Sequence, residues 1–311
     1  MLIAVVAALA ALLVAPVLIH VVYAASVRRR FPPRGVQVTA GDASLRVVTR
    51  GTGPAVLLVH GMNGTAQDFP DALLDDLARD HTVLALDRPG HGGSSRGRGA
   101  LDLDANARAV LAVIAARGGG RAIVVGHSYG GAVALRSAEL EPARVAGLVL
   151  LTPCTVVDDR NRRYTGLPLP PGFARRVALW AATLPVGLVT TRRTRREAWH
   201  PVAPRGDLTF SRAWALVPSQ TEAALENFHT LAPDLAALAA DLPRIAAPVV
   251  VLAGEQDLIT PWRAHAAWLP GAIAGAALDV RPGAGHWLVR QQPEAVAAAV
   301  RGVRVADPAR A

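Results

Sequence analysis

Lysine is absent from this chain, and cysteine is nearly so. All 33 basic residues are arginine, which we attribute to coding bias and not to function. The single cysteine, Cys154, excludes an intrachain disulfide, and a lone thiol fits a reducing compartment. Charged residues make up only 18% of the 311 residues, against 51% hydrophobic residues. This composition excludes a disordered chain and predicts a substantial core.

Motifs for nucleic acids and metals are also missing. The formal net charge of +9 would suit a phosphate-rich partner. However, the charge concentrates in Arg28–Arg34 and Arg192–Arg196, and we find no nucleic-acid-binding motif, so no such partner is expected. Solvated surface or anionic lipid headgroups account for these two clusters. The histidines do not recur at the spacing of metal ligands, so neither a metal nor another cofactor is expected.

The first part of the chain lacks charged side chains altogether. From Leu2 to Ala25 the sequence is dominated by Ala, Val, Leu and Ile. A helix of this length, rising about 1.5 Å per residue, spans a hydrocarbon layer of about 30 Å. We therefore predict that residues 1–27 form a transmembrane anchor. A cleaved signal segment, and hence an exported protein, is the alternative, although no basic residue precedes the apolar run as in signal peptides.

The arginines that follow this run predict its orientation. Arg28, Arg29, Arg30 and Arg34 come directly after it, and only the terminal amine precedes it. The positive-inside rule then places the rest of the chain on the cytoplasmic face. A reporter fused to the C-terminus is expected to behave as a cytoplasmic protein. A reporter that is active only outside the membrane would contradict this orientation.

Beyond a Pro32-Pro33 linker, strand and helix patterns alternate. Two short strands are predicted as an antiparallel pair around a turn at Gly41-Asp42, namely Val36–Thr39 and Leu45–Thr49. Later apolar runs predict buried strands at Ala55–Val59, Thr82–Leu86, Ala122–Val125, Val145–Leu151, Pro248–Ala253 and Ala277–Val280. Helical patterns cover Asp68–Arg79, Asp104–Arg117, the segment from the turn at 126–130 to Leu140, Pro261–Leu269, and the segment from Pro293 onward. This alternation predicts an α/β fold with a mostly parallel sheet and helices on both faces.

The stretch from Thr155 to Arg244 interrupts the alternation, because it reads as short helices and loops without a clear strand. We therefore predict a core of residues 28–154 and 245–311 with an insertion at 155–244. The large apolar side chains of the insertion either line a pocket or form its own core, and they are Trp180, Leu184, Trp199, Phe210, Trp214 and Phe228.

The strongest motif is Gly126-His127-Ser128-Tyr129-Gly130, which lies between a predicted strand and a predicted helix. A serine hydroxyl needs an adjacent base and an accessible position to act as a nucleophile. The flanking glycines permit a tight turn with Ser128 at its apex. This Gly-x-Ser-x-Gly turn, in this context, resembles the nucleophile elbow of the α/β-hydrolase family. The resemblance extends from about Val36 to the C-terminal helix and implies the α/β-hydrolase fold.

The resemblance implies roles for four further segments. Asp257, after the predicted strand 248–253, matches the acid of the family, and His286, after the last strand, matches its base, in the family's order of nucleophile, acid and histidine. Glu255 is the local competitor for the acid. The backbone amides of Met62 and Tyr129 would form the oxyanion hole. The insertion corresponds to a helical cap between core strands 6 and 7.

Three further candidates, Asp87, His91 and His127, receive no catalytic role. Asp87 and His91 belong to a glycine-rich loop that matches a structural motif of the family, and both precede the nucleophile. We assign that loop a structural role, and we assign His127 no proton transfer.

The implied activity is hydrolysis of carboxylic esters of small to medium apolar substrates through an acyl-enzyme. A cofactor-free haloperoxidase, a lactonase, a carbon–carbon bond hydrolase and a non-catalytic binding protein anchored in the membrane remain alternatives.

Overall fold

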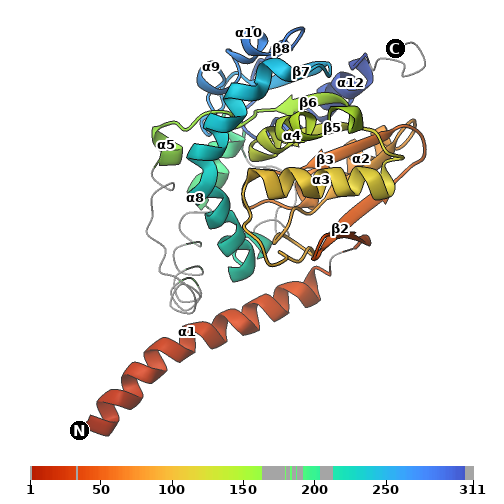
Figure 1. Ribbon diagram of the computed structural model, residues 1–311. Helices are drawn as coiled ribbons and strands as arrows, with labels where there is room; N and C mark the ends of the chain where they lie inside the picture. Colours follow the sequence, from red (N-terminus) through yellow and green to blue (C-terminus); the bar gives the residue numbers. More distant parts are fainter. Residues whose placement is uncertain are drawn as a thin grey trace.

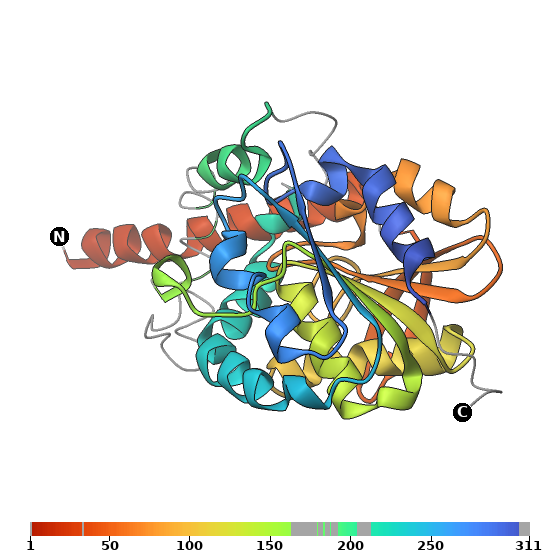
Figure 2. The same ribbon diagram turned by 90° about the horizontal axis from the view of Figure 1, so that it is seen from above.

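The chain folds around a single mixed sheet, as a computed structural model shows (Figures 1 and 2). The structure describes residues 2–32, 34–162, 179, 183, 187, 192–203 and 213–304, without the side chains of 2–13, 160 and 161. The strands are β1 (Val36–Ala40), β2 (Ala43–Arg50), β3 (Ala55–Val59), β4 (Thr82–Leu86), β5 (Ala122–His127), β6 (Val145–Leu151), β7 (Val249–Gly254) and β8 (Ala277–Arg281). The helices are α1 (Leu2–Arg30), α2 (Asp71–Leu77), α3 (Leu103–Arg117), α4 (Tyr129–Leu140), α5 (Asp159–Arg162), α8 (Pro218–Asp241), α9 (Trp262–His265), α10 (Leu269–Ala272), α11 (Leu288–Gln291) and α12 (Pro293–Gly302).

The eight strands are ordered β1-β2-β4-β3-β5-β6-β7-β8. The β1–β2 hairpin is antiparallel and joins β4 in antiparallel fashion, whereas all neighbours from β4 to β8 are parallel. The register pairs Val59 with Gly126, so β3 and β5 end side by side. Loops that follow these parallel strands therefore meet at one edge of the sheet, where α/β folds bind their ligands.

Helices cover both faces of the sheet (Figure 2). Along β5, Val124 belongs to the hydrophobic cluster under α3 and α4, while its neighbours Ile123 and Val125 belong to the cluster under α2 and α12. This two-residue alternation is what a strand buried on both faces requires. It explains why the central strands appear in the sequence as unbroken apolar runs.

The predicted α/β fold is confirmed, and three of the predicted strands (55–59, 82–86 and 145–151) coincide with the observed ones. The helix predicted over Asp68–Arg79 is wrong in extent, since α2 begins only at Asp71. Phe69 is extended (φ −80°, ψ 122°) because the residue before a proline, here Pro70, disfavours the helical conformation.

The helix predicted over Pro261–Leu269 is also wrong, since two short helices, α9 and α10, replace it. Pro270 lies in the first turn of α10. There its missing N–H costs nothing, whereas inside a longer helix it would remove a hydrogen bond.

Between β6 and β7 the described residues form helices and loops and contain no strand. They comprise α5, a helical segment at 192–199 and α8. Trp199 and Trp214 are buried, and Phe228 packs against the main core, while Trp180, Leu184 and Phe210 lie outside the described residues.

Helix α1 extends away from the rest of the molecule (Figure 1). Its last turns contact the segment before α8, where Ala24 and Val27 pack with Trp214 and Val217. Over the residues whose placement is described, no helix combines the length and the apolar character needed to cross a bilayer. The predicted anchor over residues 1–27 therefore stays a prediction.

The glycine-rich loop after β4 is held by a buried ion pair with β2. Asp87 accepts hydrogen bonds from Arg46 Nε (2.5 Å), Ala66 N (2.8 Å) and Gly93 N (2.7 Å). Both charged side chains are at most 1% exposed. The partner of Asp87 is therefore a residue of another strand, and its sequence neighbour Arg88 is free for other contacts.

Replacing Asp87 with Asn leaves the buried guanidinium of Arg46 without its counter-charge. We expect the free energy of unfolding in urea to fall by about 3–5 kcal/mol. The control is Arg244→Gln, which removes the exposed partner of Asp241 and should cost less than about 1 kcal/mol. Equal, small losses in both variants would contradict a structural role for the Asp87–Arg46 pair.

Candidate active site

The predicted nucleophile lies at a sharp turn between β5 and α4. Ser128 has φ 54° and ψ −122°, a strained backbone that non-glycine residues rarely adopt. The turn is possible because β5 and α4 approach closely. A Cβ on Gly126 would lie 2.2 Å from Gly130 O, so this position admits only glycine. The backbone of Ser128 is fixed by bonds from its amide to Leu151 O (2.9 Å) and from Cys154 N to its carbonyl (3.0 Å).

The predicted base and acid are joined directly. His286 Nδ1 lies 2.8 Å from Asp257 Oδ2, and both side chains are buried. Asp257 follows β7, and His286 lies in the loop between β8 and α11. Because the carboxylate only accepts, this contact places the proton on Nδ1 and leaves Nε2 as an acceptor.

The carboxylate of Asp257 is the charged form. Burial alone would raise its pKa, but the charge that His286 carries when protonated, the hydrogen bond from His286 and the amides of Thr260 and Ile259 bring the pKa down to about 2. The two amides donate to Oδ1 at 2.9 Å and 2.7 Å. Asp257 is therefore ionised across the whole range in which a histidine base functions.

Two threonines that the sequence did not single out, together with His127, hold this pair in place. The hydroxyl oxygen of Thr260 lies 2.8 Å from Asp257 Oδ2 and 3.0 Å from His286 Nδ1. The carbonyl of His286 accepts bonds from Thr152 Oγ1 (3.0 Å) and His127 Nε2 (2.9 Å). Of the two threonines, only Thr260, a hydroxyl three residues after Asp257, leaves a signal in the sequence.

His127, to which we assigned no proton transfer, is held as a neutral ring. Burial, and then the charge of His286, lower its pKa to about 3, so the ring is neutral. Its Nε2–H is committed to the carbonyl of His286. The ring centroids of His127 and His286 are 4.9 Å apart, so the residue next to Ser128 in the chain lies against the predicted base.

The loop after β3 lies beside Ser128. A Cβ on Gly61 would lie 3.0 Å from Ser128 Cβ, so glycine permits this approach. Met62 follows Gly61 directly, and Tyr129 is the first residue of α4. The two predicted oxyanion donors thus lie on segments that flank Ser128, and the Tyr129 amide is at a helix N-terminus, where unpaired N–H groups favour negative charge.

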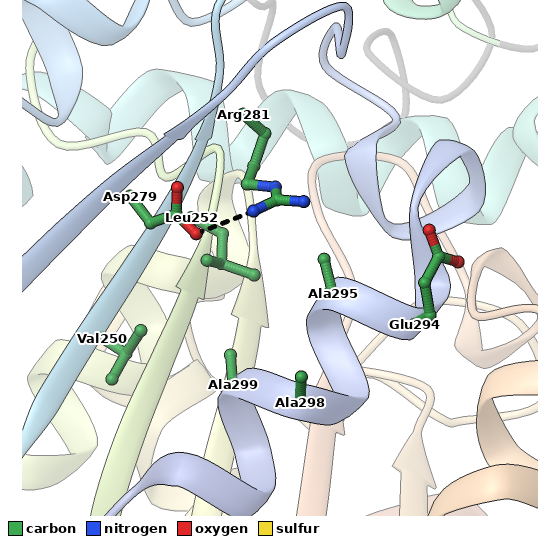
Figure 3. A pocket seen from close by; sticks show the side chains of 8 residues that line it. All are labelled: Val250, Leu252, Asp279, Arg281, Glu294, Ala295, Ala298 and Ala299. Carbon is green, nitrogen blue, oxygen red and sulfur yellow. Dashed lines mark hydrogen bonds and ion pairs between the residues drawn. The ribbon is translucent and has the colours of Figure 1, made fainter.

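Three negative observations complete the geometry. The structure describes both side chains, and Ser128 Oγ forms no hydrogen bond with His286. Hydrogen bonds between a nucleophile and its base often tighten only when substrate binds. Among the residues that the structure describes, no three His, Cys, Asp or Glu side chains are grouped as metal ligands. A cavity of about 380 Å³ lies between β7, β8 and α12 (Figure 3), but none of the five predicted site residues lines it.

Comparison with known proteins agrees with this architecture. The chain is 30% identical over 258 residues to a non-heme chloroperoxidase of Streptomyces lividans, covering 78% of this chain and 88% of that protein. It is 29% identical over 254 residues to a pimeloyl-[acyl-carrier protein] methyl ester esterase of Nitrosomonas europaea, covering 78% and 93%. The crystal structure of a hydrolase from Pseudomonas aeruginosa PA01 matches with a TM-score of 0.65 and 28% identity, covering 85% and 96%.

A family model matches residues 56–299, which begin in β3 and end within α12. This segment contains the sharp turn at Ser128 and the buried Asp257–His286 pair. The chain belongs to the alpha/beta hydrolase family.

Proposed function

We propose that this protein is a serine hydrolase that cleaves carboxylic esters, with Ser128 as nucleophile, His286 as base and Asp257 as acid. The observation that carries the proposal is the buried contact of 2.8 Å between His286 Nδ1 and Asp257 Oδ2, next to the strained turn at Ser128. A strained backbone and a buried carboxylate are both costly. Their combination on neighbouring loops is expected where catalysis uses them.

The first chemical step is acylation of the serine. Nε2 of His286 accepts the Ser128 hydroxyl proton while Oγ attacks the ester carbonyl, and the carbonyl electrons move onto its oxygen. The tetrahedral species then collapses, the C–O bond to the alcohol breaks, and His286 returns the proton to the leaving oxygen. Asp257 stabilises the imidazolium that exists between the two transfers. Water repeats the sequence and releases the acid.

The oxyanion is stabilised by backbone amides. The proposed donors are Met62 N–H, on the loop beside Ser128, and Tyr129 N–H, at the start of α4. Both donors are backbone groups that the fold holds in position, so they are pre-organised for the charge that develops.

An ester as substrate is supported by the similarity to a methyl ester esterase. The similarity to a non-heme chloroperoxidase makes cofactor-free haloperoxidase activity the second candidate function. We propose small to medium apolar acyl groups, which the apolar side chains predicted in the insertion would suit. A series of aryl esters of increasing chain length tests this preference.

We also propose that residues 1–27 attach the protein to a membrane, with the arginines at 28–34 at the lipid headgroups. The exposed surface of α1 supports this proposal. Five of its large apolar side chains are 47–67% exposed, namely Val14, Leu18, Ile19, Val21 and Val22. Exposed apolar patches commonly mark membrane or protein contacts. Alkaline extraction of membranes tests it, and release of the full chain into the supernatant would contradict it.

Ser128→Ala is expected to abolish reaction with a fluorophosphonate probe, since the probe bonds covalently to an activated serine. Turnover of an aryl ester should fall by about 10⁶-fold, as in other triads. Intact-mass spectrometry of the full chain measures the labelling. Equal labelling of the parent and the variant would exclude Ser128 as the nucleophile.

Asp257→Asn is expected to lower kcat by about 10⁴-fold, because an amide favours the wrong tautomer of His286. The lowered pKa of Asp257 adds a test of sign. A carboxylate whose pKa falls on folding stabilises the fold above its unfolded pKa, near 4, and this contribution is lost as pH falls towards about 2. The parent should therefore lose stability more steeply than the variant between about pH 4 and pH 2. Identical acid unfolding of both would show that Asp257 is not held as a carboxylate.

A further inference from the structure

Arg88 is a fully buried cation, and no carboxylate of the described residues lies within ion-pair distance of it. It follows β4, and its side chain is 0% exposed. Burying a charge without a counter-charge is expensive unless every donor is satisfied. Burial lowers the pKa of Arg88, but only to about 10, so the guanidinium keeps its charge at neutral pH.

The guanidinium contacts two successive carbonyl groups of the loop beside Ser128. Nε donates to His60 O (3.1 Å), and Nη2 donates to Gly61 O (2.9 Å). The carbonyl of Gly61 also accepts from His60 Nδ1 (2.9 Å) and Gly64 N (3.3 Å). His60 carries its proton on Nδ1, because its Nε2 accepts the backbone N–H of Arg88 (2.9 Å).

The Gly61 carbonyl and the Met62 amide belong to one peptide unit. In a planar trans peptide the C=O and N–H point in opposite directions. A fork that fixes the Gly61 oxygen therefore also fixes the direction of the Met62 N–H, the proposed oxyanion donor. At Gly61 a Cβ would press tightly on Ser128, so glycine suits this position, but glycine has little conformational preference of its own. The stiffness of this loop therefore has to come from its hydrogen bonds.

Arg88 also contacts the second proposed donor residue. Its guanidinium carbon lies 4.9 Å from the centroid of the Tyr129 ring, within the range of a cation–π contact. On its far side, Nη1 donates to Asn106 Oδ1 of α3 (2.7 Å) and Asn227 Oδ1 of α8 (2.9 Å). The guanidinium is thus held by α3 and by α8, the helix that precedes β7 in the chain.

We propose that Arg88 is a positioning residue that aims the Met62 and Tyr129 amides at the oxyanion, because its guanidinium grips the Gly61 carbonyl and lies on the Tyr129 ring. The inference rests on the proposed function, since it assigns a purpose to the same site. Arg88 itself touches no reacting atom. Loss of Arg88 should reduce the stabilisation of the transition state and leave the binding of the substrate in its ground state unchanged.

The test is Arg88→Lys in the full chain, which keeps the charge and loses the fork. We expect kcat for an aryl ester to fall by about 10- to 100-fold, less than the roughly 10²- to 10³-fold cost of a missing donor, with KM changed by less than about 3-fold. A trifluoromethyl ketone adds the Ser128 oxygen and places an alkoxide in the oxyanion hole. Its Ki should rise by the same factor as kcat falls.

The matched control is Arg46→Lys. Arg46 is equally buried, but it bonds to Asp87 and not to the carbonyls of His60 and Gly61. Both variants should melt at lower temperature, but Arg46→Lys should keep kcat and Ki within about 2-fold of the parent. Loss of activity in both variants to the same extent would reduce Arg88 to a general structural role and overturn the inference. Parent-like kcat and Ki in Arg88→Lys would overturn it equally.

Asn227→Ser covers the case in which Arg88→Lys does not fold. It removes one acceptor of the guanidinium and leaves Arg88 in place, so the same pattern in kcat and Ki is expected at about 3- to 10-fold. An unchanged Ki in this variant would contradict the inference. If the parent protein reacts with neither ester nor ketone, the proposed function fails first; if the parent reacts and the variants match it, only the role of Arg88 fails.

Discussion

The site depends on one constraint, the strained backbone turn that places Ser128 between β5 and α4. A positive φ at a serine is unfavourable, so neighbouring structure must enforce it. Two features do so: Gly126 allows the helix to approach the strand, and the parallel neighbours β3 and β6 lie on either side of β5. Since the parallel strands end at the same edge, the loops with Gly61, Asp257 and His286 are brought to this turn by the sheet itself.

Buried polar groups then give the site its shape, because each has to be satisfied. Asp257 receives two amides, the imidazole of His286 and a contact from Thr260, and the carbonyl of His286 is bonded twice. Residues between β6 and β7 take part in this network. Ala198 O accepts the amide of Trp287, next to His286, and Gln220 of α8 donates to Asn63 O, next to Met62. The segments between β6 and β7 therefore brace both sides of the site.

The sequence predicted the features that local pattern determines. The apolar strands, the glycine-flanked serine and the order of Ser128, Asp257 and His286 are all visible along the chain, and the strands and the Asp257–His286 contact are present in the structure. The helices at 68–79 and 261–269 were mispredicted because Pro70 and Pro270 limit them. The charge pairs could not be predicted. Whether Asp87 pairs with Arg46 or with its neighbour Arg88 depends on which side of β4 each side chain lies, and that is set by the packing of distant strands.

The central claim is that an acyl group is carried by Ser128. The tryptic peptide 122–136 contains Ser128 as its one serine and no threonine, so an acyl ester of an aliphatic hydroxyl in this peptide lies on Ser128. Acid quenching during turnover of a slowly deacylated aryl ester, followed by mass analysis of that peptide, is the direct measurement. The account predicts a stoichiometric acyl adduct on peptide 122–136. An adduct confined to another peptide, with turnover intact, would contradict it.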